Sequence, residues 1–92
     1  MKRIQWDPEK NAKLKEERGI SFDEILACIE NGRVLDIRGH LSKKYEHQMI
    51  FVVEMDNYIY FVPFVENTNG IFLKTIIPSR KLTKEYLKEK EK

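Results

Sequence analysis

The sequence lacks most of the devices that stabilise or anchor a small protein without a packed core. It has a single cysteine, Cys28, so it cannot form an internal disulfide, and a reducing compartment is expected. One cysteine and two histidines are too few for a structural zinc site. No apolar run approaches the length that crosses a bilayer, and the N-terminus lacks the apolar segment of a secretory signal. These absences exclude a disulfide scaffold and a membrane-spanning protein, and they favour a domain that uses no cofactor.

Familiar catalytic motifs are missing as well. The sequence offers no glycine-rich phosphate loop, metal-ligand cluster or Ser/His/Asp triad, and no repeat or linker divides it. Its 92 residues, of which 35% are charged and 41% hydrophobic, suit a single domain over residues 1–92 with one core. The net charge of +2 decides little, but many cations flank expected strands, namely Lys2, Arg3, Lys43, Lys44, Lys74, Arg80 and Lys81. These cations form either a surface for an anionic ligand or an ordinary solvated exterior.

Residues 71–80 form the stretch around which the chain is organised. They are mostly apolar, β-branched or aromatic, which predicts a strand buried on both faces in the middle of a small sheet. Pro78 cannot donate to a ladder, so the strand is expected to end there, and Ser79 can cap a following helix. The cations Lys74, Arg80 and Lys81 lie on or beside this strand. A cation in that position is costly unless it is paired or reaches a cleft, so these three are the first candidates for chemistry.

The N-terminal half predicts two helices after a short edge strand at residues 2–6. Asp7 is placed to cap the first helix, and Gly19 is placed to end it. Ser21 and Glu24 have the spacing of a capping box at the start of the second helix. The apolar face of that helix is expected to consist of Phe22, Ile25, Leu26 and Ile29.

The second half predicts an antiparallel meander. Asp56-Asn57 suits a tight hairpin turn, and residues 67–70 suit a second turn. The expected strands are residues 34–37, 47–55, 58–65 and 71–77. The predicted fold is therefore α+β, with two N-terminal helices packed on a four-stranded antiparallel sheet and a helix at the C-terminus. The C-terminal helix has few apolar residues, so we expect an exposed apolar patch that a partner or a second copy covers.

Cations, a histidine and a carboxylate around a small sheet can cleave RNA without a metal. A base takes the ribose 2′-hydroxyl proton, cations stabilise the charged phosphorane, and an acid protonates the leaving oxygen. The candidates for proton transfer are Glu46 and His47, and the candidates for charge stabilisation are Arg80, Lys81 and Lys74. Because the strand ends at Pro78, Arg80 is expected at the rim of the sheet, in a cleft close to Glu46 or His47. The alternative is structural: Glu46 and His47 then form an ordinary junction between loop and strand, and Arg80 pairs with an acidic side chain.

Three segments resemble the BrnT family of toxins. They are Trp-Asp-Pro-Glu-Lys at residues 6–10, Gly-Ile-Ser-Phe at 19–22, and Ile-Ile-Pro-Ser-Arg-Lys at 76–81 with Thr83. The match runs without a gap from Trp6 to Phe22, whereas the hairpin fits by pattern only. The resemblance implies a bacterial cytoplasmic ribonuclease of a type II toxin–antitoxin pair, related in fold to RelE-like toxins. It also implies a neutralising antitoxin with a ribbon-helix-helix DNA-binding domain. The expected assembly is either a hetero-oligomer with that antitoxin or a homodimer.

The resemblance also implies site residues. The family's Trp-Asp-x-x-Lys falls on Trp6, Asp7 and Lys10, its Glu-Arg on Glu46 and His47, and its Ser-Ala-Arg-Lys on Pro78, Ser79, Arg80 and Lys81. The residues expected to contact RNA are Trp6, Lys10, Lys43, Lys44 and Tyr45. The chain departs from the family where Glu17-Arg18 replaces Lys-His, where Leu14 replaces an asparagine, and where His47 replaces an arginine. An arginine of the last strand has only Lys74 or Thr75 near its place.

Two other functions remain open. One is a protein-interaction module that keeps the toxin fold and its partner surface but has lost catalysis. The other is a nucleic-acid-binding domain that stacks bases on Tyr45, Tyr58 and Tyr60, although alternating tyrosines on a strand more often pack within a sheet.

Overall fold

Three helices and six strands make up the computed structural model, which describes residues 3–39, 44 and 48–90. In chain order the elements are β1 (Ile4–Trp6), α1 (Pro8–Arg18), α2 (Phe22–Glu30), β2 (Val34–Gly39), β3 (Met49–Met55), β4 (Tyr58–Asn67), β5 (Gly70–Leu73), β6 (Ile77–Pro78) and α3 (Arg80–Lys90). The α+β class predicted from the sequence is confirmed.

Both N-terminal helices begin and end where their local sequence predicts. The Asp7 carboxylate accepts a hydrogen bond from the Glu9 amide at 2.9 Å, and Gly19 ends α1 in the left-handed conformation with φ of 67°. At α2 the Ser21 hydroxyl accepts from the Glu24 amide at 3.2 Å, while the Glu24 carboxylate accepts from the Ser21 amide at 3.0 Å. The predicted capping box is therefore confirmed.

The predicted meander is present, but the sheet as a whole is mixed. Strands β2, β3, β4 and β5 lie side by side in antiparallel order, and the β3–β4 turn has positive φ at both Asp56 (54°) and Asn57 (62°). The prediction of a four-stranded antiparallel sheet is wrong, because β1 pairs in parallel with β5 at one edge and β6 adds to β4. The Ile71 amide donates to the Arg3 carbonyl at 2.8 Å, and the strands come so close that a Cβ at Gly70 would collide with that carbonyl.

The strand predicted over residues 71–77 is broken in two. β5 lies inside the sheet between β1 and β4, as expected, but it ends at Leu73. Residues 74–76 then face only two residues of β4, Val62 and Pro63, before β6 resumes the pairing. Pro63 has no amide to donate to the ladder, and an extra residue opposite it forms a bulge. The break also moves Ile77 and Pro78 to an exposed edge, where the strand ends at Pro78 as predicted.

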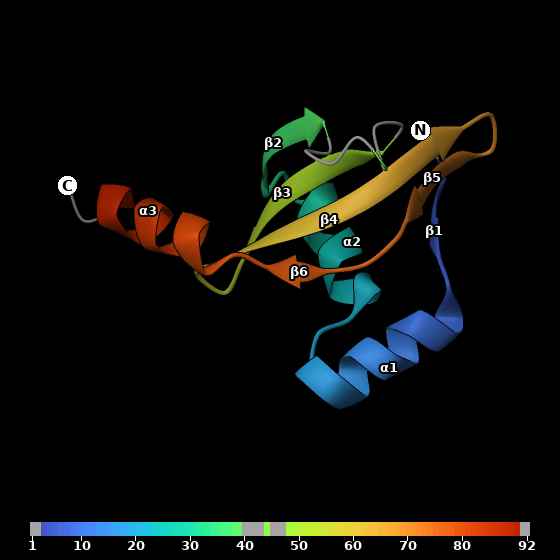
Figure 1. The fold of residues 1–92 in the computed structure, drawn as a ribbon, viewed down its shortest axis with the longest axis horizontal. Coiled ribbons are helices and arrows are strands. Elements are labelled where there is room, and N and C mark those ends of the chain that lie inside the picture. Colours follow the sequence, from blue (N-terminus) through green and yellow to red (C-terminus); the bar gives the residue numbers. More distant parts are fainter. Residues whose placement is uncertain (1–2, 40–43, 45–47, 91–92) are drawn as a thin grey trace.

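One core joins α1 and α2 to the sheet, and Figure 1 shows α2 lying behind β3 and β4. Phe22 and Ile25 of α2 have no exposed surface, and they pack beneath β3, β4 and β5. The buried core consists of Leu14, Phe22, Ile25, Cys28, Phe51, Val53, Val62, Phe64, Leu73 and Ile76. Cys28 is thus a small buried side chain, as expected of a cysteine beside an apolar helix face, and burial raises the pKa of its thiol.

Apolar side chains remain exposed at the opposite end of the sheet from β1. Leu35 and Ile37 on the edge strand β2 are about half exposed, and Met49 beside them is 39% exposed. Two further apolar side chains, Ile77 and Leu87, are also exposed. None of the described helices is long and apolar enough to cross a membrane.

Candidate functional site

A cleft of about 240 Å³ lies between helix α1 and the connection from β5 to β6. Its lining residues are Lys10, Lys13, Leu14, Glu17, Arg18 and Thr75. Lys10, Lys13 and Glu17 recur at spacings of three and four residues, which places them on one face of the helix. Leu14 on the same face points into the core and is 5% exposed. The helix therefore presents a charged stripe to the cleft and an apolar contact to the core.

A hydrogen bond across the cleft holds its two walls together. The Arg18 guanidinium donates to the Ile76 carbonyl at 3.1 Å, across a sequence separation of 58 residues. The bulge at residues 74–76 makes this bond possible, because it removes Ile76 from the ladder with β4 and turns Thr75 toward α1. A guanidinium carries five N–H donors, so this one hydrogen bond leaves other donors of Arg18 for a ligand in the cleft.

Helix α1 is fixed to α2 by a buried asparagine. The Asn11 side-chain oxygen accepts from the Phe22 amide at 2.7 Å, and its NH₂ group donates to the Asp23 carboxylate at 3.0 Å. Asn11 is 8% exposed, and its amide is the main cause that lowers the pKa of Asp23 below 3.8. This contact sets the position of the charged stripe relative to the sheet.

The cleft has the composition of an anion site. Lys10, Lys13 and Arg18 contribute three positive charges, and Glu17 contributes the one negative charge among the lining residues. A guanidinium and ammonium groups hold phosphate oxygens by charge-assisted hydrogen bonds. Among residues 3–39, 44 and 48–90, no three His, Cys, Asp or Glu side chains lie close enough together to hold a metal ion.

Trp6 has a packing role. Its ring stacks on Phe22 with centroids 5.8 Å apart and planes at 25°, and it packs against the core. It is half-buried, and with Arg3, Gln5 and Phe72 it lines a second, open hollow beside β1. Lys10 is exposed in the cleft on the neighbouring helix. Of the other residues expected to contact RNA, Lys44 is exposed.

The three cations predicted on the last strand have different surroundings. Lys74 is exposed at the bulge, where its Nζ lies 5.5 Å from the centre of the Phe72 ring. Arg80 and Lys81 are exposed in the first turn of α3, which follows β6 directly. The predicted residues Lys43, Tyr45, Glu46 and His47 lie outside the described part of the chain. The expected approach of Arg80 to Glu46 or His47 therefore stays a prediction.

Sequence reasoning missed Lys13, Arg18 and Thr75 as site residues. The helical spacing of Lys10, Lys13 and Glu17 was available as a signal, because it places one charged stripe on α1. Nothing in the local sequence indicated that Thr75 would join them, since that contact depends on the bulge.

Comparison with known proteins gives one result. A family model described as the ribonuclease toxin BrnT of type II toxin–antitoxin systems matches residues 6–85 of the 92. No curated protein and no solved structure shows a match to the chain.

Proposed function

The chain belongs to the BrnT family of ribonuclease toxins, and on that premise we propose that it cleaves RNA without a metal ion. The observation that carries the proposal is the cleft on α1, where Lys10, Lys13 and Arg18 surround a space large enough for a phosphate group. Lys10, the last residue of the motif at residues 6–10, lies in one wall, and Thr75, directly before the motif at residues 76–81, lies in the other.

The chemistry we propose is attack of the ribose 2′-oxygen on the neighbouring phosphorus, which breaks the bond from phosphorus to the 5′-oxygen of the next nucleotide. Glu46 or His47 takes the proton of the 2′-hydroxyl and a proton is given to the leaving 5′-oxygen, while Arg80, Lys81 and Lys74 stabilise the negative charge that builds up on the phosphorane. A guanidinium is suited to this role because it stays charged at every relevant pH and can hold two oxygens at once. The three cations in the α1 cleft repel a divalent metal ion. Their presence supports a reaction that uses no metal.

We further propose a cytoplasmic toxin that is neutralised by a ribbon-helix-helix antitoxin. A type II system implies a protein partner as well as an RNA target. The order of the elements, with two helices before an antiparallel meander and one helix after it, supports a relationship to RelE-like toxins.

The test is RNA cleavage by the purified chain in the presence of EDTA. Activity should persist in EDTA, and Arg80→Ala should lower the cleavage rate by about a hundredfold or more, the usual scale for one lost transition-state contact. Lys10→Ala should weaken RNA binding. The exposed Lys88 of α3 provides a control, and Lys88→Ala should leave the rate unchanged. Unchanged cleavage by a folded Arg80→Ala protein would remove that residue from the catalytic assignment.

A second function is favoured by two positions at which the chain differs from its family. Leu14 replaces a polar residue and is buried in the core, and the Arg18 guanidinium bonds to the Ile76 carbonyl. Leu14 therefore serves packing and one donor of Arg18 serves the fold, which favours a toxin-fold protein that binds its partner without cleaving RNA. Absence of cleavage by the wild-type chain, together with tight antitoxin binding, would establish this function instead.

A further inference from the structure

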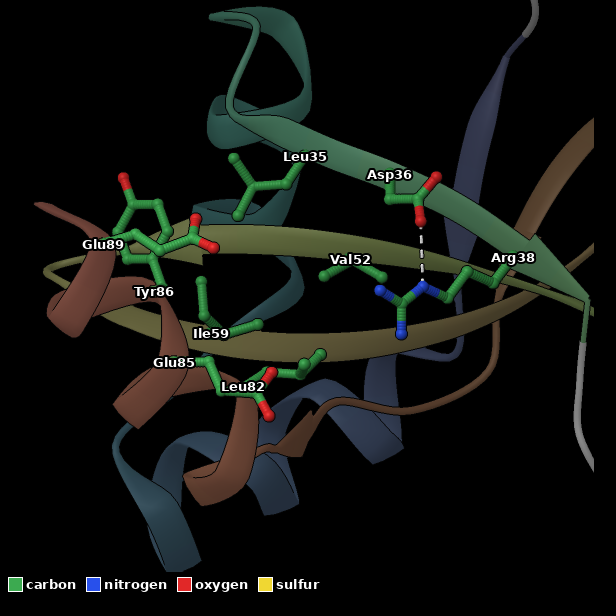
Figure 2. A pocket seen from close by; sticks show the side chains of 9 residues that line it. All are labelled: Leu35, Asp36, Arg38, Val52, Ile59, Leu82, Glu85, Tyr86 and Glu89. Carbon is green, nitrogen blue, oxygen red and sulfur yellow. Dashed lines mark hydrogen bonds and ion pairs between the residues drawn. The ribbon is translucent and has the colours of Figure 1, made fainter.

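A groove of about 240 Å³ lies on the sheet face opposite α2, between the edge strand β2 and helix α3 (Figure 2). Its lining residues are Leu35, Asp36, Arg38, Val52, Ile59, Leu82, Glu85, Tyr86 and Glu89. Its floor is formed by Val52, which is 3% exposed, and by Ile59, which is 1% exposed. This groove is separate from the cleft on α1, and it shares none of the residues that line that cleft.

The helical wall of the groove is fixed before anything binds. The Ile59 amide donates to the Thr83 hydroxyl at 2.8 Å, and that hydroxyl donates to the Ser79 carbonyl at 2.7 Å. Further along α3, the Tyr86 hydroxyl donates to the Glu54 carboxylate at 3.4 Å, which also accepts from Arg33 at 3.0 Å. Because these two sets of hydrogen bonds already hold α3 in place, the helix loses little conformational entropy when a partner binds to it.

Apolar surface continues over the lip of the groove. The register between β2 and β3 shifts at Leu35, which makes that residue a bulge, and its side chain lines the groove while remaining 48% exposed. Figure 2 shows Leu35 on the strand side and the carboxylates of Glu85 and Glu89 on the helix side. A groove with an apolar floor and an exposed apolar lip is typical of a surface that a partner covers.

The charge of the groove limits what that partner can be. Asp36 is paired with Arg38 at 2.9 Å, and this hydrogen bond lowers the pKa of Asp36. Within the described part of the chain, no hydrogen bond or ion pair joins the side chain of Glu85 or Glu89 to another residue. These two carboxylates lie one turn apart and give the groove a negative charge on a chain whose net charge is +2. They repel the phosphates of RNA and attract lysine or arginine.

We propose that this groove is the docking site for a segment of the antitoxin, in which apolar side chains are flanked by lysine or arginine. The inference rests on the proposed function, because it takes the occupant to be the antitoxin of a type II pair. The apolar side chains pack on Val52, Ile59 and Leu35, and the cations pair with Glu85 and Glu89. The toxin therefore binds its two partners on surfaces of opposite charge.

The test is the affinity of the purified cognate antitoxin for variants of the full chain. Glu89→Lys should weaken binding by about tenfold or more, because it replaces an attraction by a repulsion, and Leu35→Gln should weaken it by about tenfold, which corresponds to about 1.4 kcal/mol. Each has a matched control outside the groove, Glu30→Lys at the exposed end of α2 and Leu87→Gln on α3. Both controls should bind within about twofold of wild type. Thermal melts check that all four variants fold.

The outcomes separate this inference from the proposed function. Groove variants that bind the antitoxin as tightly as the controls overturn the inference, whether or not the chain cleaves RNA. Groove variants that lose RNA affinity instead, or that abolish self-association without weakening antitoxin binding, overturn it in favour of another occupant. RNA cleavage without antitoxin should be unchanged in both groove variants. An absence of cleavage in the wild type would contradict the ribonuclease function alone, because the affinities are measured without RNA.

Discussion

Replacing Thr83 by valine should destabilise the protein by about 2 kcal/mol. Thr83 is 6% exposed, and its hydroxyl is the acceptor for the buried Ile59 amide at 2.8 Å. Valine has nearly the same shape and is also β-branched, so packing and helix propensity change little. The Ser79 carbonyl keeps the Thr83 amide as a donor at 3.0 Å, which leaves the Ile59 amide as the group that loses its partner. A buried donor without a partner costs about 1–3 kcal/mol.

Thr83→Ser is the matched control, because it keeps the hydroxyl and loses only a methyl group. Its cost should be about 1 kcal/mol. Urea denaturation gives the two free energies of unfolding, and a thermal melt should place the midpoint of Thr83→Val about 10 °C below that of the wild type. A valine variant that is as stable as the serine variant, or more stable, would show that the hydroxyl does not hold α3 against β4.

Two further predictions concern the junction of α1 and α2. Ser21→Ala should cost about 1 kcal/mol, because the Glu24 amide loses its capping acceptor, and an unchanged melting temperature would contradict this. Asp23 has a lowered pKa in the folded protein, so the stability it contributes is present above its ordinary pKa of 3.8 and is lost as the pH falls through the lowered folded value. Asp23→Asn should therefore be less stable than wild type at pH 7, and the difference should shrink below about pH 4. Equal differences in urea denaturation at pH 7 and pH 3 would refute a stabilising role for the Asp23 charge, which bonds to Asn11 and lies 3.5 Å from the Lys15 ammonium.

Several features of this fold are determined by a few adjacent residues. Asp7 and Gly19 set the bounds of α1, and Asp56-Asn57 sets the β3–β4 turn, because each interaction closes within a few residues and depends on one side chain or one backbone conformation. The residue pattern also determines the order of the meander, since consecutive strands joined by short turns pair with each other. The family itself was predictable for the same reason, because three short segments carry the resemblance to it.

The candidate site was only partly predictable. Lys10 was identified from the sequence and lines the α1 cleft, whereas Lys13 and Arg18 were missed although they lie on the same helix. Trp6 was expected to contact RNA, and the structure gives it a stacking partner in Phe22. Local patterns identify the type of side chain needed for a function, but they do not say which distant segment that side chain meets.

The sequence by itself therefore determined the helices, the turns and the order of the meander, and it identified Lys10 as a candidate residue. Only the tertiary structure decided the parallel pairing of β1 with β5, the bulge opposite Pro63, and the bond from Arg18 to the Ile76 carbonyl. These features join segments far apart in the chain, and their energies come from packing and from satisfying backbone groups that no short window of sequence contains. The cleft on α1 and the groove beside α3 both arise where such segments meet.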